Sequence, residues 1–164
     1  SEPKRTSVGW THVLFHDGQP VSQYYDLFIP IVDHIQDRLG RGTFELFRLR
    51  LAMLHHNHFV EDFNTPHTDH DSKHMTGIYY FHDSDGDTIL FDQCDDPNGD
   101  VNRRINEIFT QDYTIAERVK PEKNKFVLFD GNRFHASSNP KINQYRIVLN
   151  FNFRGMPDDI LTSP

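Results

Sequence analysis

One short segment holds the residue types in this chain that are best suited to chemistry. His67 and Asp69 are two residues apart, and side chains two apart in an extended segment point to the same side. No other His-x-Asp occurs among the 11 histidines. A third ligand must come from far along the chain, and His135 is favoured because it follows the apolar run 126–129 and a turn at 130–132. Two histidines and one carboxylate on one face of a metal suit non-haem Fe(II) oxygen chemistry.

Other potential ligands lie close to this segment. Asp71 would share the face of Asp69 if the strand continued, so the two carboxylates compete, and we favour Asp69. His55, His56 and His58 form a cluster whose spacing fits no compact site with a carboxylate. We therefore expect these three histidines to lie at the surface or at the rim of a pocket.

The composition indicates a folded protein of one domain, residues 1–164, with a core at about 43–154. The chain has 164 residues, of which 36% are hydrophobic and 13% aromatic, unlike a disordered chain. Its net charge of −7 favours neither nucleic acid nor an anionic membrane as a partner. A single cysteine, Cys94, excludes an internal disulfide framework. With no visible secretory signal and no apolar run long enough to cross a bilayer, we expect a cytoplasmic location.

The elements that must position these ligands are mostly strands. Residues 21–39 have apolar residues at helical spacing, with Pro30 expected to kink or split the helix and Gly40 to end it. Period-two or β-rich patterns predict strands at 8–15, 44–53, 75–82, 88–92, 113–119, 125–130 and 144–153. Residues 95–112 favour neither helix nor strand. Many short strands after a leading helix predict a mainly β fold, a jelly roll braced by the N-terminal helix.

The last predicted strand carries an arginine on its polar face. One side of residues 145–153 is apolar, and the other carries Arg146, Val148, Asn150 and Asn152. This second face must meet either a polar cavity or solvent. In a cavity, Arg146 could bind a carboxylate through two parallel hydrogen bonds.

Taken in order, these motifs resemble the 2-oxoglutarate and Fe(II)-dependent dioxygenases, most closely the prolyl 4-hydroxylase-like branch. His67-x-Asp69, the distal His135 and Arg146, eleven residues later, follow the family order. Residues 86–91 look like that branch's Gly-rich turn and strand, and residues 126–131 look like its strand before the distal histidine.

The resemblance implies a double-stranded β-helix with iron inside its mouth. His67, Asp69 and His135 would be the ligands of Fe(II), and 2-oxoglutarate and dioxygen would take the open positions. The implied reaction hydroxylates a substrate C–H bond and releases succinate and carbon dioxide. Ascorbate is a candidate reductant.

The resemblance also implies a cosubstrate site. Arg146 would hold the C5 carboxylate of 2-oxoglutarate. The family's second contact to that carboxylate implies Tyr80 or Tyr79. We favour Tyr80, because the Ile-Tyr-Tyr segment resembles a prolyl hydroxylase strand whose second tyrosine has this role. Asn150 lies on the face of Arg146, so we expect it near the cosubstrate or the substrate.

The substrate class implied by the resemblance is a prolyl residue in a peptide or protein. Arg103, Arg104 and Lys120 could give a peptide groove a basic rim, although each is also an ordinary surface charge. A free amino acid or another small molecule is an alternative substrate. A nucleic-acid demethylase is disfavoured, because those enzymes carry a second arginine six residues after the first, whereas Arg154 lies eight after Arg146. A non-catalytic, cupin-like module that binds zinc is the remaining alternative.

Overall fold

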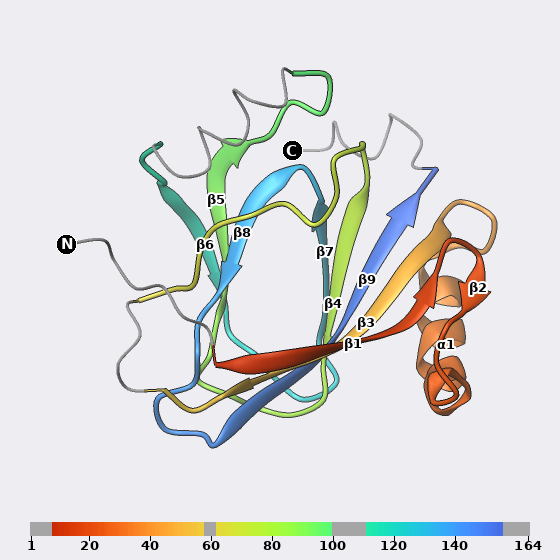
Figure 1. Ribbon diagram of the computed structural model, residues 1–164, viewed down its shortest axis with the longest axis horizontal. Coiled ribbons are helices and arrows are strands. Elements are labelled where there is room, and N and C mark those ends of the chain that lie inside the picture. The colour runs from red at the N-terminus through yellow and green to blue at the C-terminus, as the bar shows by residue number, and fades with distance from the viewer. Residues whose placement is uncertain (1–7, 58–61, 100–110, 156–164) are drawn as a thin grey trace.

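Two antiparallel sheets form the framework of the protein (Figure 1). The computed structural model describes residues 8–57, 62–99 and 111–155. Within these ranges the larger sheet has the order β2-β1-β3-β9-β4-β7 and the smaller sheet has the order β6-β5-β8. The strands are β1 (Gly9–His16), β2 (Gln19–Pro20), β3 (Glu45–His55), β4 (Met75–Tyr80), β5 (Thr88–Cys94), β6 (Ile115–Val119), β7 (Phe126–Asp130), β8 (Arg133–Ser137) and β9 (Tyr145–Arg154). This arrangement confirms the predicted jelly roll.

The helical region is shorter than the sequence predicts. A 3-10 turn, η1 (Tyr25–Phe28), comes before the α-helix α1 (Ile29–Leu39). Pro30 lies in the first turn of α1 and so does not split a longer helix, because a proline there removes an N–H that has no partner inside the helix. Gly40 ends the helix with a φ of 91°, a backbone angle that glycine adopts without steric cost.

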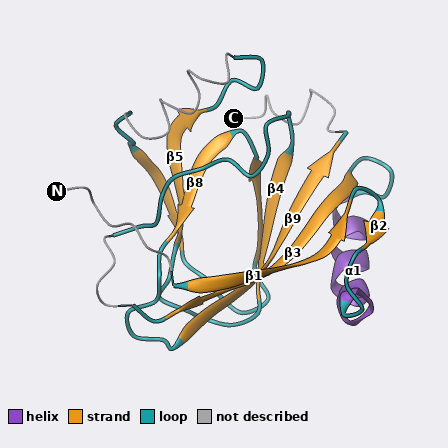
Figure 2. Cartoon of the chain, viewed as in Figure 1, coloured by secondary structure: helices purple, strands orange, loops and turns teal. Residues whose placement is uncertain are grey.

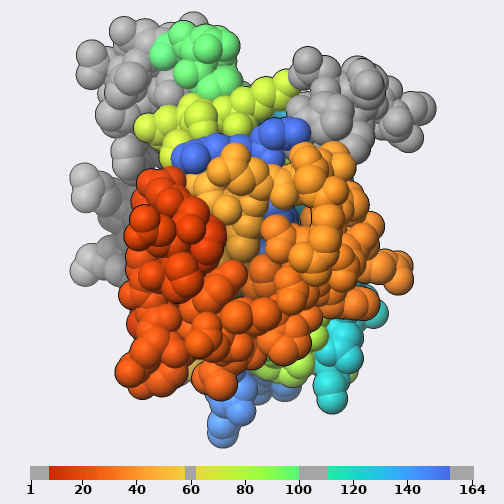
Figure 3. Space-filling view, turned by 90° about the vertical axis from the view of Figure 1, so that its right-hand side faces the viewer, coloured from red at the N-terminus to blue at the C-terminus, as the bar shows by residue number. Residues whose placement is uncertain are grey.

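The outer face of the larger sheet is apolar and carries the helix. Leu49, Leu149 and Phe151 are fully buried there, and α1 contributes Val32 and Ile35 to the same core. Figure 2 shows α1 alongside the sheet, and Figure 3 shows the N-terminal segment covering this side of the molecule. The predicted brace is therefore confirmed, and it leaves the opposite face of the sheet free to line the interior.

The inner faces of the sheets are where polar residues collect. Arg146, Val148 and Asn150 point inward from β9, as their alternation predicts, and they meet a cavity rather than solvent. Asn152 lies on the same face but is fully buried beside Asp69.

Strand β8 is missing from the predicted set. His135 is the middle residue of this strand. The strand was not predicted because its five residues, Arg-Phe-His-Ala-Ser, carry too few apolar side chains to show a period of two. Of the unassigned residues 95–112, only 95–99 and 111–112 are described. No helix in the described residues is long and apolar enough to cross a membrane.

Candidate metal centre

Backbone hydrogen bonds bring His67 and His135 together. The N–H of His67 donates to the carbonyl of His135 over 2.9 Å, and the N–H of His135 donates back over 3.0 Å. This isolated antiparallel bridge fastens the segment after residue 62 to strand β8. As a result, the two rings lie with centroids 4.7 Å apart although the residues are far apart in sequence.

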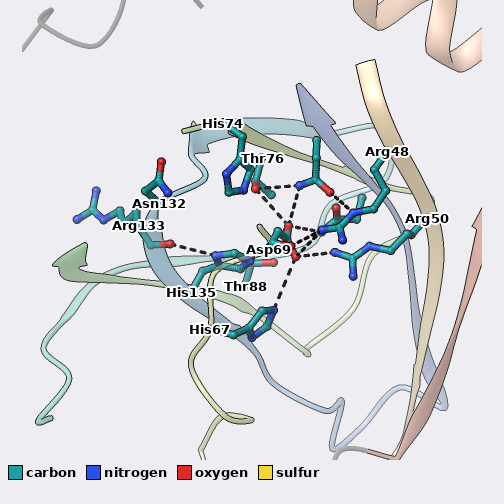
Figure 4. Close-up of polar contacts among 12 residues, drawn as sticks. Arg48, Arg50, His67, Asp69, His74, Thr76, Thr88, Asn132, Arg133 and His135 are labelled. Atoms are coloured by element: carbon teal, nitrogen blue, oxygen red, sulfur yellow. Dashed lines mark hydrogen bonds and ion pairs between the residues drawn. The ribbon is translucent and has the colours of Figure 1, made fainter. Parts of the chain in front are cut away.

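Asp69 completes a three-residue cluster that could hold a metal ion (Figure 4). One potential ligand atom from each of His67, Asp69 and His135 lies within 4.8 Å of the other two. Nε2 of His67 is 3.9 Å from Oδ1 of Asp69, and Nε2 of His135 is 3.7 Å from Oδ2. These separations are too long for hydrogen bonds and leave room for an ion between the three side chains.

The second nitrogen of each imidazole is already occupied. Nδ1 of His67 lies 3.0 Å from the carbonyl of Thr65, and Nδ1 of His135 lies 3.1 Å from the carbonyl of Arg133. A carbonyl can only accept, so Nδ1 carries the proton and Nε2 keeps its lone pair in both rings. Nε2 of His135 is buried and has no hydrogen-bond partner, so its lone pair is available to a metal ion.

Four side chains orient the Asp69 carboxylate. Oδ2 accepts hydrogen bonds from Thr76 (3.2 Å), Asn150 (3.0 Å) and Asn152 (3.0 Å). Oδ1 accepts one from Nη2 of Arg50 over 2.5 Å. Because Oδ2 has three donors and Oδ1 has one, Oδ1 is the oxygen with a lone pair free for a metal.

The charges in the cluster favour metal binding at neutral pH. Burial and the neighbouring His67 lower the pKa of His135 to about 4, so its ring is neutral. Burial alone would raise the pKa of Asp69, but His135, Arg50 and His67 outweigh it and keep the pKa well below its usual value. The site therefore offers one carboxylate and neutral imidazole, which are the forms that coordinate metals.

The competing ligands do not join this cluster. Asp71 is exposed, and Nδ1 of His70 accepts a hydrogen bond from the backbone N–H of Ser72 over 3.0 Å. His55 and His56 are also exposed, as expected, and His58 lies outside the described residues.

A cavity of about 290 Å³ connects the cluster to Arg146. Arg146 is buried, and its Nη2 donates to Oγ1 of Thr88 over 2.6 Å. Tyr80 donates its hydroxyl to the same Thr88 oxygen over 2.7 Å. Burial lowers the pKa of Arg146, and no carboxylate of the described residues forms an ion pair with it.

The structure separates the other predicted site residues. Tyr79 lies on the opposite face of β4, where its hydroxyl donates to Oδ1 of Asn124, because neighbouring residues in a strand alternate. Tyr80 points inward but is fully buried behind Thr88 and does not line the cavity. Asn150 does line the cavity, and its contact is with Asp69.

Five residues that contact the site were not predicted: Arg48, Arg50, Thr76, Thr88 and Asn152. All of them lie on the inner faces of strands. Strand alternation shows that Arg48 and Arg50 share a face, but it does not tell whether that face meets solvent. Only the pairing of β3 with β9 shows that both arginines face the cluster.

Comparison with known proteins identifies the family and supports the fold. The family model of the 2OG-Fe(II) oxygenase superfamily matches residues 52–154. No curated protein sequence matches the chain.

Solved structures of oxygenases share the fold at low sequence identity. A 2OG-Fe(II) oxygenase family protein from Burkholderia pseudomallei has a TM-score of 0.59 and 10% identity, over 90% of this chain and 66% of that one. The alpha ketoglutarate dependent carbocyclase SnoK from nogalamycin biosynthesis has a TM-score of 0.60 and 12% identity, over 98% and 73%. A Trichoplax adhaerens prolyl hydroxylase, solved with a hypoxia inducible factor peptide, has a TM-score of 0.53 and 12% identity, over 96% and 69%.

The chain spans about two thirds of the length of these solved proteins. Their likeness establishes the fold, and the family model covers well over half of the chain. The family uses Fe(II), 2-oxoglutarate and dioxygen, and a cluster of two histidines and one aspartate stands inside the fold where a metal fits. This chain therefore belongs to the 2OG-Fe(II) oxygenase superfamily.

Proposed function

We propose that this protein hydroxylates a substrate C–H bond with Fe(II) held by His67, Asp69 and His135. The observation that carries the proposal is the unpartnered, buried Nε2 of His135 beside the oriented Asp69 carboxylate. With iron and 2-oxoglutarate bound, dioxygen would be the oxidant: one of its oxygen atoms would enter succinate as carbon dioxide leaves, and the other would enter the product. The protein fixes the positions of the ligands around the ion.

Arg146 is the proposed partner of the C5 carboxylate of 2-oxoglutarate. A buried guanidinium without a carboxylate partner is costly, and an incoming anion relieves that cost. Arg146 lines the same cavity as the three proposed iron ligands, so one dicarboxylate in this cavity could contact both the ion and Arg146.

Thr88 extends this proposed cosubstrate site. Its oxygen accepts hydrogen bonds from both Arg146 and Tyr80, which uses both lone pairs. The hydroxyl proton of Thr88 is therefore free to donate into the cavity. We assign the second contact with the carboxylate to Thr88. Tyr80 supports this site from behind, because its hydroxyl bonds Thr88 and the centroid of its ring lies 5.6 Å from the guanidinium carbon of Arg146.

The proposed substrate is a prolyl residue in a peptide. The prolyl 4-hydroxylase-like motifs support this choice, together with the shared fold of the Trichoplax enzyme. Lys120 is exposed, as a basic rim requires, whereas Arg103 and Arg104 lie outside the described residues. A small-molecule substrate is the second candidate, since SnoK, named as a carbocyclase of nogalamycin biosynthesis, has the same fold.

Substrate-stimulated turnover tests both candidates. The protein is supplied with Fe(II), 2-oxoglutarate and ascorbate, and succinate is measured with proline-containing peptides, free L-proline, other amino acids or methylated oligonucleotides. Peptides should stimulate succinate release and gain the mass of one oxygen atom on proline, while free proline should do so poorly. Stimulation by amino acids alone would replace the prolyl proposal with the small-molecule one, and stimulation by oligonucleotides alone would replace it with a demethylase.

A further inference from the structure

Two arginines from strand β3 enter the metal cluster, and their hydrogen bonds differ. Arg48 donates from Nε to Oδ1 of Asn152 over 2.8 Å and from Nη2 to the carbonyl of Asp69 over 2.5 Å. These bonds tie Arg48 into the framework behind the cluster. Arg50 has one partner in the described residues, the Asp69 carboxylate, and its Nε is buried without any partner.

Arg50 also borders the open space, whereas Arg48 does not. The cavity is lined by Arg50 together with His67, Asp69 and Asn150, and the Arg50 side chain is 24% exposed. Figure 4 shows Arg50 and His67 on two sides of Asp69. A molecule that approaches the ion would therefore meet the guanidinium of Arg50.

The charges of the cavity do not cancel when the proposed cofactors are bound. The charged side chains that line it are Arg50, Asp69 and Arg146. The two positive charges of Fe(II) match the two negative charges of 2-oxoglutarate, and Asp69 matches one arginine. One positive charge remains. We assign it to Arg50, because Arg146 would pair with the C5 carboxylate, and Asp69 would bind the ion and so pair less strongly with Arg50. An unmatched charge on a partly buried arginine in this cavity favours an anionic ligand.

This local excess is opposite in sign to the whole chain. The net charge of −7 repels anions at long range, but that field is screened beyond about 8–10 Å at physiological salt. A preference for an anion would therefore come from groups at the site. The Nη2 atom of Arg50 lies 2.5 Å from a proposed ligand oxygen, so the recognised group must lie close to the carbon that is oxidised.

We propose that Arg50 recognises a carboxylate of the substrate, so that the preferred peptide carries an acidic residue next to the target proline. This inference rests on the proposed function, because it places the substrate beside the ion. A guanidinium that bonds a carboxylate in a partly buried site contributes enough to bring about tenfold selectivity or more over the matching amide.

The test compares two peptides that differ only in charge, acetyl-Glu-Pro-Glu-amide and acetyl-Gln-Pro-Gln-amide. Mn(II) replaces iron and 2-oxoglutarate is present, so no turnover is needed. Broadening of the peptide proton resonances by the paramagnetic ion reports binding close to the metal. The acidic peptide should bind about tenfold more tightly to the unmodified chain. Arg50→Gln should abolish this difference, and Arg50→Lys, which keeps the charge, should retain most of it.

Arg41→Gln is the matched control. It removes the same charge from an exposed site, where Arg41 pairs with Asp33 and Asp37, and it should leave the peptide preference unchanged. If the chain holds Mn(II) but binds the two peptides equally, or binds neither peptide, this inference alone would be overturned. A preference for the acidic peptide that survives Arg50→Gln would also overturn it. A tenfold loss of 2-oxoglutarate affinity in the Arg50→Gln variant, or the loss of Mn(II) from that variant, would overturn it as well. Failure of the unmodified chain to bind Mn(II) through His67 would overturn the proposed function as well.

Discussion

Replacing Thr88 with valine removes one hydroxyl and keeps the shape of the side chain. In the unliganded protein the change breaks the bond from Arg146 and the bond from Tyr80, both in a site without exposure to water. A hydrogen bond to a charged group contributes roughly 1.5–3 kcal/mol and a neutral one roughly 0.5–1.5 kcal/mol. We therefore expect Thr88→Val to lower the free energy of unfolding by about 2–4 kcal/mol. For a chain of this size that is a fall in Tm of roughly 4–15 °C.

The same change should weaken binding of 2-oxoglutarate, because Thr88 would no longer donate to the C5 carboxylate. The loss of one charge-assisted bond predicts an increase in Kd of about ten- to a hundredfold. Denaturant titration measures the first effect. The visible absorption band that Fe(II) and 2-oxoglutarate form without oxygen measures the second.

Thr76→Val is the matched control for this prediction. It removes an equally buried hydroxyl, but one that bonds Asp69 at the metal end of the cavity. With saturating Fe(II), its 2-oxoglutarate affinity should stay within about twofold of the unmodified chain, since no charge-assisted bond to the cosubstrate is lost. A Thr88→Val protein with unchanged stability and unchanged 2-oxoglutarate affinity would refute the bridging role of the hydroxyl.

Two further predictions concern the site, and one concerns a buttressing carboxylate outside it. Alanine at any of the three proposed iron ligands should abolish metal binding and turnover without loss of the fold, as measured by metal analysis and circular dichroism, whereas His70→Ala should do neither. Arg146→Ala should raise the 2-oxoglutarate concentration for half-saturation by about ten- to a hundredfold, and Tyr80→Phe should raise it less. Burial alone would raise the pKa of Asp85, but the backbone N–H groups of residues 141–143 outweigh it and lower that pKa from 3.8. The stability from these bonds is present above that value and is lost as the pH falls through the lowered pKa, so Asp85→Ala should be destabilising near pH 7 and much less so at a pH below the lowered pKa; an equal loss at both pH values would contradict this reasoning.

Local patterns in the sequence were sufficient to predict the fold class. Alternation along residues 145–153 showed two faces, and the apolar one does form the core with α1. The spacing of His67 and Asp69 is likewise a local pattern, and the structure brings both to His135. The apolar run at 126–129 and the turn after it pointed to His135, and the family order agreed. Strand β8 itself was not predicted, because it is too short and too polar to show a period of its own.

The residues that surround the ligands could not be predicted in this way. Thr88 acquires its role only because β5 and β9 belong to different sheets that face each other across the cavity. The choice of Tyr80 over Tyr79 was right about direction, since Tyr80 points inward. It could not show that Thr88 would stand between the Tyr80 hydroxyl and the cavity, because this depends on the separation of two strands that are distant in sequence.

The backbone bridge between His67 and His135 sets the spacing of two imidazoles before any ion arrives. A set of donors that is already in place has little means of choosing among divalent ions of similar size. Affinity then follows the general order for first-row metals, in which Fe(II) binds more weakly than Co(II), Ni(II) or Cu(II). We therefore expect protein exposed to Ni(II) to hold nickel in place of iron, which metal analysis would measure. In a cell, the active fraction would therefore follow the ratio of iron to competing metals at the place where the chain is loaded.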